Sequence, residues 1–247
     1  MTRKISILGA GAWGTALACV ASRAGNETII WGRDKEVITE LNENRKNTKY
    51  LGDLNIAEHV RAKSDLVEAV SDRDIILLCV PTQTLAETLR VIKSYIGDAV
   101  IISCCKGIDR NSEKLPAELV SQEFANNKNG VLSGPSFATD VVQDLPTAVT
   151  IASEDASFAA ELALIFSDGN FRCYASNDVK GVELGGALKN VLALGVGTAR
   201  GMQLGASAEA ALIARGFAEI KRIAVALGSN SETLNGLSGL GDLVLTC

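Results

Sequence analysis

The stretch KISILGAGAWGTALA (residues 4–18) decides the fold, because it joins an apolar run, a Gly-x-Gly-x-x-Gly turn and a run of small helix-forming residues. In such a pattern Gly9 permits a tight turn, Gly11 lets a phosphate approach the backbone, and Gly14 lets the helix pack closely on the strand. Free N–H groups and the dipole at the start of the helix favour anions. The stretch therefore predicts a binding site for the pyrophosphate of a dinucleotide.

Ala12 and Trp13 fill the variable positions of this turn and are further candidate cofactor contacts, although Trp13 could equally pack in the core. Two alternatives remain: a glycine-rich turn that binds nothing, or a signal peptide or membrane span over the uncharged segment Ile5–Ser22. Three glycines would weaken a helix there by about 1 kcal/mol each. The sequence therefore favours the strand and turn, with no membrane insertion and a cytoplasmic location.

Short β-branched apolar segments alternate with amphipathic segments up to about residue 176. Parallel strands that are buried on both faces have this uninterrupted apolar character. The alternation predicts an α/β fold with a doubly wound, mostly parallel sheet of the Rossmann type and ligands at the carboxyl ends of the strands. The predicted strands are Ile5–Gly9, Thr28–Trp31, Ile75–Val80, Val100–Ser103, Val131–Leu132 and Ala148–Ile151, and the predicted helices are Gly14–Ala24, Asp34–Asn42, Thr84–Tyr95 and Leu115–Phe124.

The pattern of apolar residues changes near Asn177, after which no strand-like apolar segment is found. Long segments rich in Ala, Leu and Gly follow with helical period, over Val179–Ala199 and Ser207–Leu227. We therefore predict two domains: a dinucleotide-binding domain over residues 1–176 and an all-helical substrate and catalytic domain over residues 177–247.

Composition excludes several other functions. The chain of 247 residues has a net charge of −5 and no segment that concentrates Lys and Arg, so we predict no nucleic-acid partner. Its six cysteines show no paired spacing, which is typical of a protein in a reducing compartment. With His59 as the single histidine, the sequence predicts no metal site.

The end of the second predicted strand bears on the choice of cofactor. NAD-selective enzymes usually place an acidic residue there, which binds the ribose hydroxyls. Here Trp31 and Gly32 are followed by Arg33, which is placed to meet a 2′-phosphate, so we predict NAD or NADP, with NADP at least accepted. In the alternative, Arg33 faces solvent and Asp34 caps the next helix.

Polar residues interrupt apolar segments where the strand ends should converge. Lys106 and the segment LSGPSFA (132–138) each follow a predicted strand, Lys189-Asn190 interrupts a helix of small residues, and Asp242 stands in a glycine turn. Each could be structural, as a surface lysine or a helix cap. However, buried lysines need partners, and a second cation lowers a lysine pKa toward the range of a general acid or base. We therefore predict that Lys106, Lys189 and Asp242 share one cleft.

With these motifs in view, the chain resembles the bacterial type of NAD(P)-dependent sn-glycerol-3-phosphate dehydrogenase over essentially its whole length. The resemblance implies hydride exchange between NAD(P)H and the small molecule dihydroxyacetone phosphate, which supplies glycerophospholipid synthesis; a homodimer is an open expectation. The segments that carry the resemblance are GAGAWGTALA (9–18), WGR (31–33), CKGI (105–108), LSGPSFA (132–138), GVELGGALKNVLALGVG (181–197), ARG (214–216) with Glu219 after it, and GLSGLGDLVLTC (236–247).

The resemblance also implies roles for single residues. Lys189 would be the general acid or base at the substrate oxygen, Lys106 would contact both substrate and cofactor, and Asp242 would orient lysine and substrate. Other residues that match the family's sites are Gly134, Ser136, Asn190 and Thr246 for the substrate, and Ala138 for the cofactor.

The chain departs from the family pattern in two places. Ser207 stands where many members have Asn, and the family continues beyond the position of Cys247 with a segment that binds the substrate phosphate. We therefore expect a C-terminally truncated chain that binds cofactor and reduces substrate poorly. Two alternatives stay open: an inactive nucleotide-binding fragment, and a β-hydroxyacid or 6-phosphogluconate-type dehydrogenase, although the latter would be expected to have Ser-Gly-Gly in place of Ser-Gly-Pro at residues 133–135.

Overall fold

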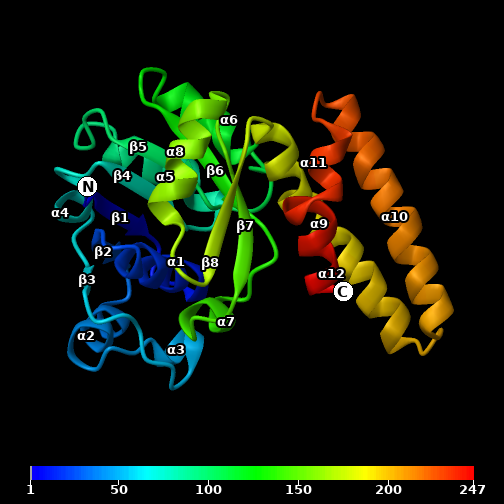
Figure 1. The fold of residues 1–247 in the computed structure, drawn as a ribbon, viewed down its shortest axis with the longest axis horizontal. Helices are drawn as coiled ribbons and strands as arrows, with labels where there is room; N and C mark the ends of the chain where they lie inside the picture. The colour runs from blue at the N-terminus through cyan, green and yellow to red at the C-terminus, as the bar shows by residue number, and fades with distance from the viewer. Residues whose placement is uncertain (1) are drawn as a thin grey trace.

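One sheet of eight strands organises the computed structural model, which describes residues 2–247 (Figure 1). The strand order is β3-β2-β1-β4-β5-β6-β7-β8, and the first six strands run parallel, in the order of a dinucleotide-binding sheet. The strands are β1 (Lys4–Leu8), β2 (Glu27–Trp31), β3 (Val60–Lys63), β4 (Ile75–Leu78), β5 (Val100–Ser103), β6 (Asn129–Ser133), β7 (Thr147–Ala152) and β8 (Phe171–Ser176).

Helices cover both faces of this sheet, because its central strands are apolar on both sides. Alternate residues of β1 and β4 enter two separate buried clusters, one on each face. One cluster contains residues of α1, α2 and α8, and the other contains residues of α4, α5 and α6. The helices of this part are α1 (Ala12–Arg23), α2 (Lys35–Glu43), α3 (Thr48–Leu51), α4 (Leu66–Val70), α5 (Thr82–Ile92), α6 (Pro116–Glu123), α7 (Ala138–Val142) and α8 (Ala156–Phe166).

The elements after Ser176 are all helical and pack beside the sheet, on the right in Figure 1. The core of this part is a separate apolar cluster that contains Leu192, Val196, Ile220 and Leu243. The helices are α9 (Val179–Gly201), α10 (Ala206–Ala226), α11 (Ser231–Asn235), the π-helix η1 (Leu237–Gly241) and α12 (Asp242–Thr246).

Aspartate side chains cap several of the helices, among them α2, α8 and α9. Asp34, Asp155 and Asp178 accept hydrogen bonds from N–H groups in the first turns of α2, α8 and α9. Each cap satisfies donors that have no partner within the helix. The second oxygen of Asp178 also accepts from the N–H of Asn230 at 2.9 Å, which joins the start of α9 to the start of α11.

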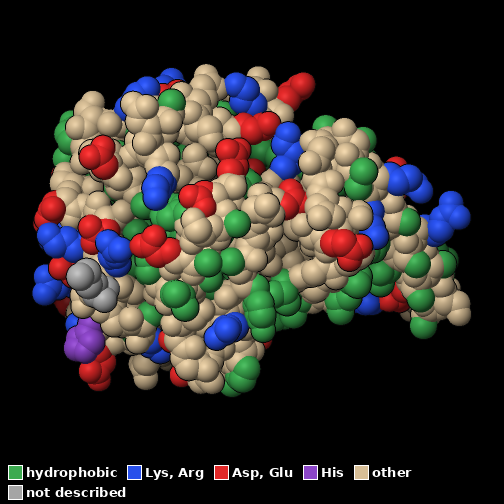
Figure 2. Space-filling model, turned by 45° about the horizontal axis from the view of Figure 1, so that its top comes forward, with side chains coloured by type: hydrophobic (Ala, Val, Ile, Leu, Met, Phe, Trp, Pro, Cys, Tyr) green, Lys and Arg blue, Asp and Glu red, His purple; other side chains and the backbone are tan. Residues whose placement is uncertain are grey.

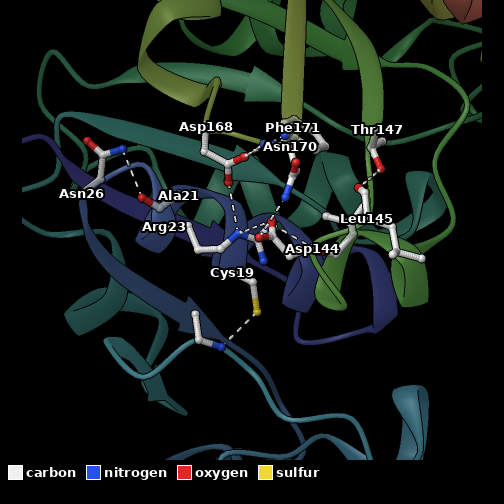
Figure 3. A network of polar contacts seen from close by, with 12 residues as sticks. Cys19, Ala21, Arg23, Asn26, Asp144, Leu145, Thr147, Asp168, Asn170 and Phe171 are labelled. Carbon is white, nitrogen blue, oxygen red and sulfur yellow. Dashed lines mark hydrogen bonds and ion pairs between the residues drawn. The ribbon is translucent and has the colours of Figure 1, made fainter.

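Arg23, in the last turn of α1, fastens that helix to the far part of the sheet (Figure 3). Its Nε lies 3.0 Å from Asp168 and 3.2 Å from Asp144, and its Nη2 donates to the carbonyl of Val141. The segment suspected as a leader is thus a buried strand and helix in the middle of the fold. Among residues 2–247, no helix has the length and apolar character needed to cross a bilayer.

The predicted α/β fold with a following all-helical part is confirmed, although two strands escaped prediction and one direction differs. β3 and β8 lie at the edges of the sheet and alternate buried with exposed residues, so they lack the apolar run that marks the inner strands. β7 runs antiparallel to β6, which its composition does not reveal. On the face drawn in Figure 2, acidic and basic side chains are interspersed, and the basic ones do not form a continuous patch.

Candidate active site

The glycine-rich turn lies between β1 and α1, next to β4, where the strand order reverses. A Cβ atom at Gly9 would stand 2.5 Å from the carbonyl oxygen of Cys79, and one at Gly14 would stand 1.9 Å from the oxygen of Gly9. Gly9 also has a φ of +123°, which favours glycine. A Cβ at Gly11 would meet nothing within 4 Å. The first and third glycines are therefore required by packing, and the second leaves open space above the backbone.

That open space is part of a cavity of about 1200 Å³. Its lining includes every residue that the sequence assigned to the cofactor: Gly9, Gly11, Ala12, Trp13, Gly14, Arg33, Lys106 and Ala138.

The lining fits a nicotinamide dinucleotide. The Nε1 atom of Trp13 is buried and has no hydrogen-bond partner among the described residues, so a polar ligand would satisfy it. The backbone at Gly11 lies open at the start of α1, and the N–H groups of a first helical turn, which have no partner within the helix, are typical ligands of phosphate oxygens.

At the end of β2, the structure confirms the predicted helix cap by Asp34, and the contact of Arg33 with a 2′-phosphate stays a prediction. Asp34 caps α2 by accepting from the N–H groups of Glu36 and Val37, and it also pairs with Lys49 at 2.7 Å. The Lys49 hydrogen bond holds the pKa of the Asp34 carboxyl below its ordinary value. Arg33 is exposed, lines the cavity, and has no ion-pair or hydrogen-bond partner among the described side chains.

The three groups singled out in the sequence lie in one cluster. The Nζ of Lys189 is 2.5 Å from Oδ1 of Asp242, and the Nζ of Lys106 is 2.6 Å from Oδ2 of the same carboxylate. Lys189 also donates to the hydroxyl of Thr246 at 2.9 Å. The side chain of Asp242 is 2% exposed, that of Lys189 10% and that of Lys106 27%, so neither lysine is a free surface group.

Burial is the main cause that lowers the pKa of Lys189 below its ordinary value of 10.5. The positive charge of Lys106 lowers this pKa further, whereas the hydrogen bond and charge of Asp242 oppose the shift. Burial and the charge of Lys106 thus bring Lys189 closer to neutrality, while Asp242 keeps the amine hydrogen-bonded. Such an amine can give or take a proton at a substrate oxygen.

Small residues let the helix that carries Lys189 approach the sheet. A Cβ atom at Gly185 would stand 2.3 Å from the carbonyl oxygen of Ser238, and one at Gly186 would stand 3.0 Å from the hydroxyl of Ser133. The Oγ of Ser133 has no hydrogen-bond partner among residues 2–247. The backbone of α9 therefore touches both η1 and the end of β6.

The other residues assigned to the substrate are placed differently. Ser136 lines the cavity, and its hydroxyl donates to the carbonyl of Gly134 at 3.2 Å. A Cβ at Gly134 would stand 2.8 Å from the Cα of Val149, so this glycine packs against β7. Asn190 is exposed and makes no side-chain hydrogen bond among the described residues, so the structure does not bring it into contact with the lysine cluster.

Sequence reasoning missed two buried residues that hold the site. Asn47 is fully buried and donates to the carbonyl of Ala10 and to the hydroxyl of Thr15, which braces the glycine-rich turn. It lies in a polar loop that gives no sign of this role. Thr82 donates to the carbonyl of Lys106 at 3.0 Å, and its position at the start of α5, shortly after the carboxyl end of β4, could have indicated a site residue.

Comparison with known proteins covers nearly the whole chain. The family profile for the N-terminal part of NAD-dependent glycerol-3-phosphate dehydrogenase matches residues 4–159, and the profile for its C-terminal part matches residues 178–247. The glycerol-3-phosphate dehydrogenase (NAD(P)+) of Brucella canis is 48% identical over 248 residues, an alignment that covers 100% of this chain and 76% of the relative. That of a Chelativorans species is 48% identical over 247 residues, covering 98% of this chain and 75% of the relative.

Solved structures agree with this comparison. The crystal structure of glycerol-3-phosphate dehydrogenase from Coxiella burnetii is 39% identical, with a TM-score of 0.94, and the match covers 100% of this chain and 76% of that one. The enzyme from Saccharomyces cerevisiae is 28% identical, with a TM-score of 0.88 and coverage of 100% and 78%.

Proposed function

Because this chain belongs to the NAD-dependent glycerol-3-phosphate dehydrogenase family, we propose that its buried lysine cluster performs the acid–base step of that reaction. The chain is an oxidoreductase that interconverts dihydroxyacetone phosphate and sn-glycerol 3-phosphate with NAD or NADP. The observation that carries the proposal is the single carboxylate of Asp242 bound to both Lys189 and Lys106.

Lys189 is the general acid in reduction, since its protonated amine delivers a proton to the carbonyl oxygen as that oxygen gains negative charge. In the reverse direction the neutral amine removes the proton of the hydroxyl group. Asp242 holds the amine in place and limits the fall of its pKa. The nicotinamide, when bound, supplies or accepts the hydride, and the protein supplies geometry and charge.

Lys106 faces both the cavity and Asp242, so it contacts the cofactor on one side and the substrate on the other. Its charge also favours an anionic substrate beside the lysine cluster. Ser136 lines the substrate side of the cavity, Ala138 lines the cofactor side, and Thr246 positions the amine of Lys189. Gly134 is proposed as a substrate contact through its backbone, whose carbonyl accepts the hydrogen bond from Ser136. Asn190 remains a weaker candidate, because its side chain is exposed.

The adenosine end of the cavity suits NADP. Asp34 is engaged by Lys49 and by the N–H groups of α2, so its carboxylate is not free to bind ribose hydroxyls. Arg33 and Lys49 both line the cavity there and offer positive charge to a 2′-phosphate.

The remaining proposals concern organisation and setting. The division into residues 1–176 and 177–247 is supported by the end of the sheet at Ser176 and by the separate apolar cluster of the helices. A cytoplasmic location is supported by six cysteines that are all free thiols.

A homodimer is supported by the exposed Val191 and Leu194 on α9, and analytical ultracentrifugation tests it. The product, sn-glycerol 3-phosphate, supplies glycerophospholipid synthesis.

The proposal is tested by following NADPH absorbance at 340 nm with dihydroxyacetone phosphate and, separately, with 3-oxoacids. We expect turnover with the phosphate ester and none with the 3-oxoacids, at the low rate that the sequence predicts for this chain. Lys189→Ala should abolish turnover while the Kd for NADPH, measured by fluorescence, stays within about twofold, because the amine lies outside the lining of the dinucleotide cavity. Near-normal turnover of this variant would reject the role of Lys189. NADPH binding without turnover in the wild type would favour the nucleotide-binding alternative.

A further inference from the structure

Glu183 is a buried acid that the reaction described above does not use. It lies in the second turn of α9, is 8% exposed, and stands between the buried residues Val182 and Leu184. No cation forms an ion pair with it among residues 2–247. Buried carboxyl groups are normally paired or hydrogen-bonded, so its partner shows what the side chain does.

That partner is the backbone of α6. The Oε1 of Glu183 accepts a hydrogen bond of 2.9 Å from the N–H of Ala117, the second residue of the helix. Pro116, at the first position, has no N–H, and the next two N–H groups bond to the carbonyl of Leu115. Glu183 therefore accepts the remaining donor of the first turn, which would otherwise be buried without a partner.

Glu183 also lies close to the segment that carries Lys106. Burial is the main cause that raises the pKa of the Cys105 thiol, and the nearby charge of Glu183 raises it further. That thiol contacts the carbonyls of Val80 and Leu78 at 3.0 and 3.3 Å, which fixes the residue before Lys106. One side chain of α9 thus contacts the start of α6, and its charge acts on the residue before Lys106.

The carboxyl group of Glu183 holds its proton to higher pH than an ordinary glutamic acid does. Burial raises its pKa to about 8; the hydrogen bond from Ala117 opposes this shift, and the charge of Glu118 adds to it. Among residues 2–247, Glu118 is the titratable group whose charge acts on the Glu183 carboxyl, whereas the Cys105 thiol is affected by both Cys79 and Glu183. A neutral carboxyl group still accepts a hydrogen bond through its carbonyl oxygen, so ionisation is not needed for the contact.

We propose that Glu183 is a positioning residue for catalysis, which fixes α9 against the start of α6 and so holds Lys189 and Lys106 within reach of one carboxylate. Lys189 is borne by the same helix six residues later, and Lys106 lies on the segment that leads into α6. A shift of α9 along this contact would separate the two amines that Asp242 now joins. The inference rests on the roles proposed above for these lysines.

The test compares three variants of the enzyme at pH 7. Glu183→Gln keeps a neutral acceptor for Ala117, and we expect its kcat within about twofold of wild type. Glu183→Ala removes the acceptor, and we expect kcat to fall at least about tenfold while the Kd for NADPH stays within about twofold. The matched control is Glu118→Ala. Glu118 also caps α6, by accepting from the N–H of Leu115 at 2.8 Å, but it is exposed, so this variant should keep its kcat.

A pH profile separates positioning from simple loss of stability. In Glu183→Ala the alkaline limb of kcat/KM should shift, because Lys189 loses its fixed surroundings, whereas in Glu183→Gln it should stay in place. The inference is overturned when Glu183→Ala keeps its kcat, or when Glu118→Ala is equally damaging, which would assign the effect to α6 alone. Should Glu183→Ala not fold, Glu183→Asp, one methylene shorter, replaces it, and an unchanged kcat there also overturns the inference. Loss of activity in Lys189→Ala with full activity in Glu183→Ala would refute this inference and leave the proposed function intact.

Discussion

Lys189 and Lys106 bind the same carboxylate, and burial together with the charges of this cluster sets the pKa of Lys189. Burial and the charge of Lys106 lower the pKa of Lys189, while Asp242 raises it. Reduction needs the protonated amine, so kcat/KM for dihydroxyacetone phosphate should fall as pH rises through this lowered pKa. Oxidation of glycerol 3-phosphate needs the neutral amine and should rise over the same range.

Two substitutions should move that limb in opposite directions. Lys106→Met removes a positive charge and should shift the alkaline limb of reduction to higher pH. Asp242→Asn removes the negative charge and should shift it to lower pH, with a loss of stability on the order of 3–5 kcal/mol because the buried Lys189 and the part-buried Lys106 lose their charged partner. The pH dependence of kcat/KM for each variant checks the signs, and shifts in the same direction would contradict the assigned cluster.

These residues could be found in the sequence because a charge inside an apolar segment is conspicuous. Lys106 follows a buried strand, Lys189 interrupts a helix of small residues, and Asp242 stands in a glycine turn. Asn47 and Glu183 could not be found in this way. Their partners, the carbonyl of Ala10 and the N–H of Ala117, are backbone groups far away in the chain. The local sequence around Asn47 and Glu183 gives no indication of such contacts.

At the scale of elements, α9 can pack closely against η1 because glycines leave part of its surface without side chains. A methyl group at Gly185 would collide with the carbonyl oxygen of Ser238 at 2.3 Å, whereas one at Gly197 would meet nothing within 4 Å. Gly185→Ala should therefore push η1 away from α9 and lower both Tm and kcat. Gly197→Ala, the control on the same helix, should stabilise the protein by up to about 1 kcal/mol. Thermal unfolding and initial rates measure both effects, and equal effects at the two positions would contradict this packing.

The glycines of the turn between β1 and α1 have different roles: Gly14 is needed for folding, and Gly11 is needed for cofactor binding. Gly14→Ala places a methyl group 1.9 Å from the carbonyl oxygen of Gly9, so we expect a clear loss of Tm. Gly11→Ala meets open space, so we expect an unchanged Tm and at least about tenfold weaker NADPH binding, since the methyl group occupies the approach of the pyrophosphate. Calorimetry gives both quantities; normal NADPH affinity in Gly11→Ala would contradict the placement of the phosphates.

Whether a strand could be predicted from the sequence depended on how many of its faces are buried. The inner strands β1, β4 and β5 were predicted because both of their faces are covered, which demands apolar residues throughout. β3 and β8 have one exposed face, so charged or polar residues interrupt their apolar pattern, and the sequence did not predict them as strands. The antiparallel direction of β7 depends on the connection through α7, and a strand's own residues do not record its direction.

At the scale of the whole molecule, the buried acid Glu183 makes stability depend on pH. Its pKa is about 8 in the folded chain, well above the ordinary value of 4.5. The folded state therefore holds a proton that the unfolded state releases, and the stability associated with this group is full below about pH 4.5 and is lost as pH rises through about 8. Glu183→Gln cannot titrate and should not share this loss. Its Tm relative to wild type should thus rise between pH 5 and pH 8.5, as scanning fluorimetry can measure; a constant difference would contradict the burial of an unpaired acid.

The chain passes from the sheet to the helical part once, between Ser176 and Val179. Lys106 lies before that crossing, and Lys189 and Asp242 lie after it, so the two pieces contribute complementary halves of one ion-pair cluster. A gene cut at this point would encode two polypeptides, neither of which holds a complete set of reacting groups. If turnover returned when the two polypeptides were mixed, it would measure their association. The connection between Ser176 and Val179 is therefore a suitable place to divide the chain for a split-enzyme sensor.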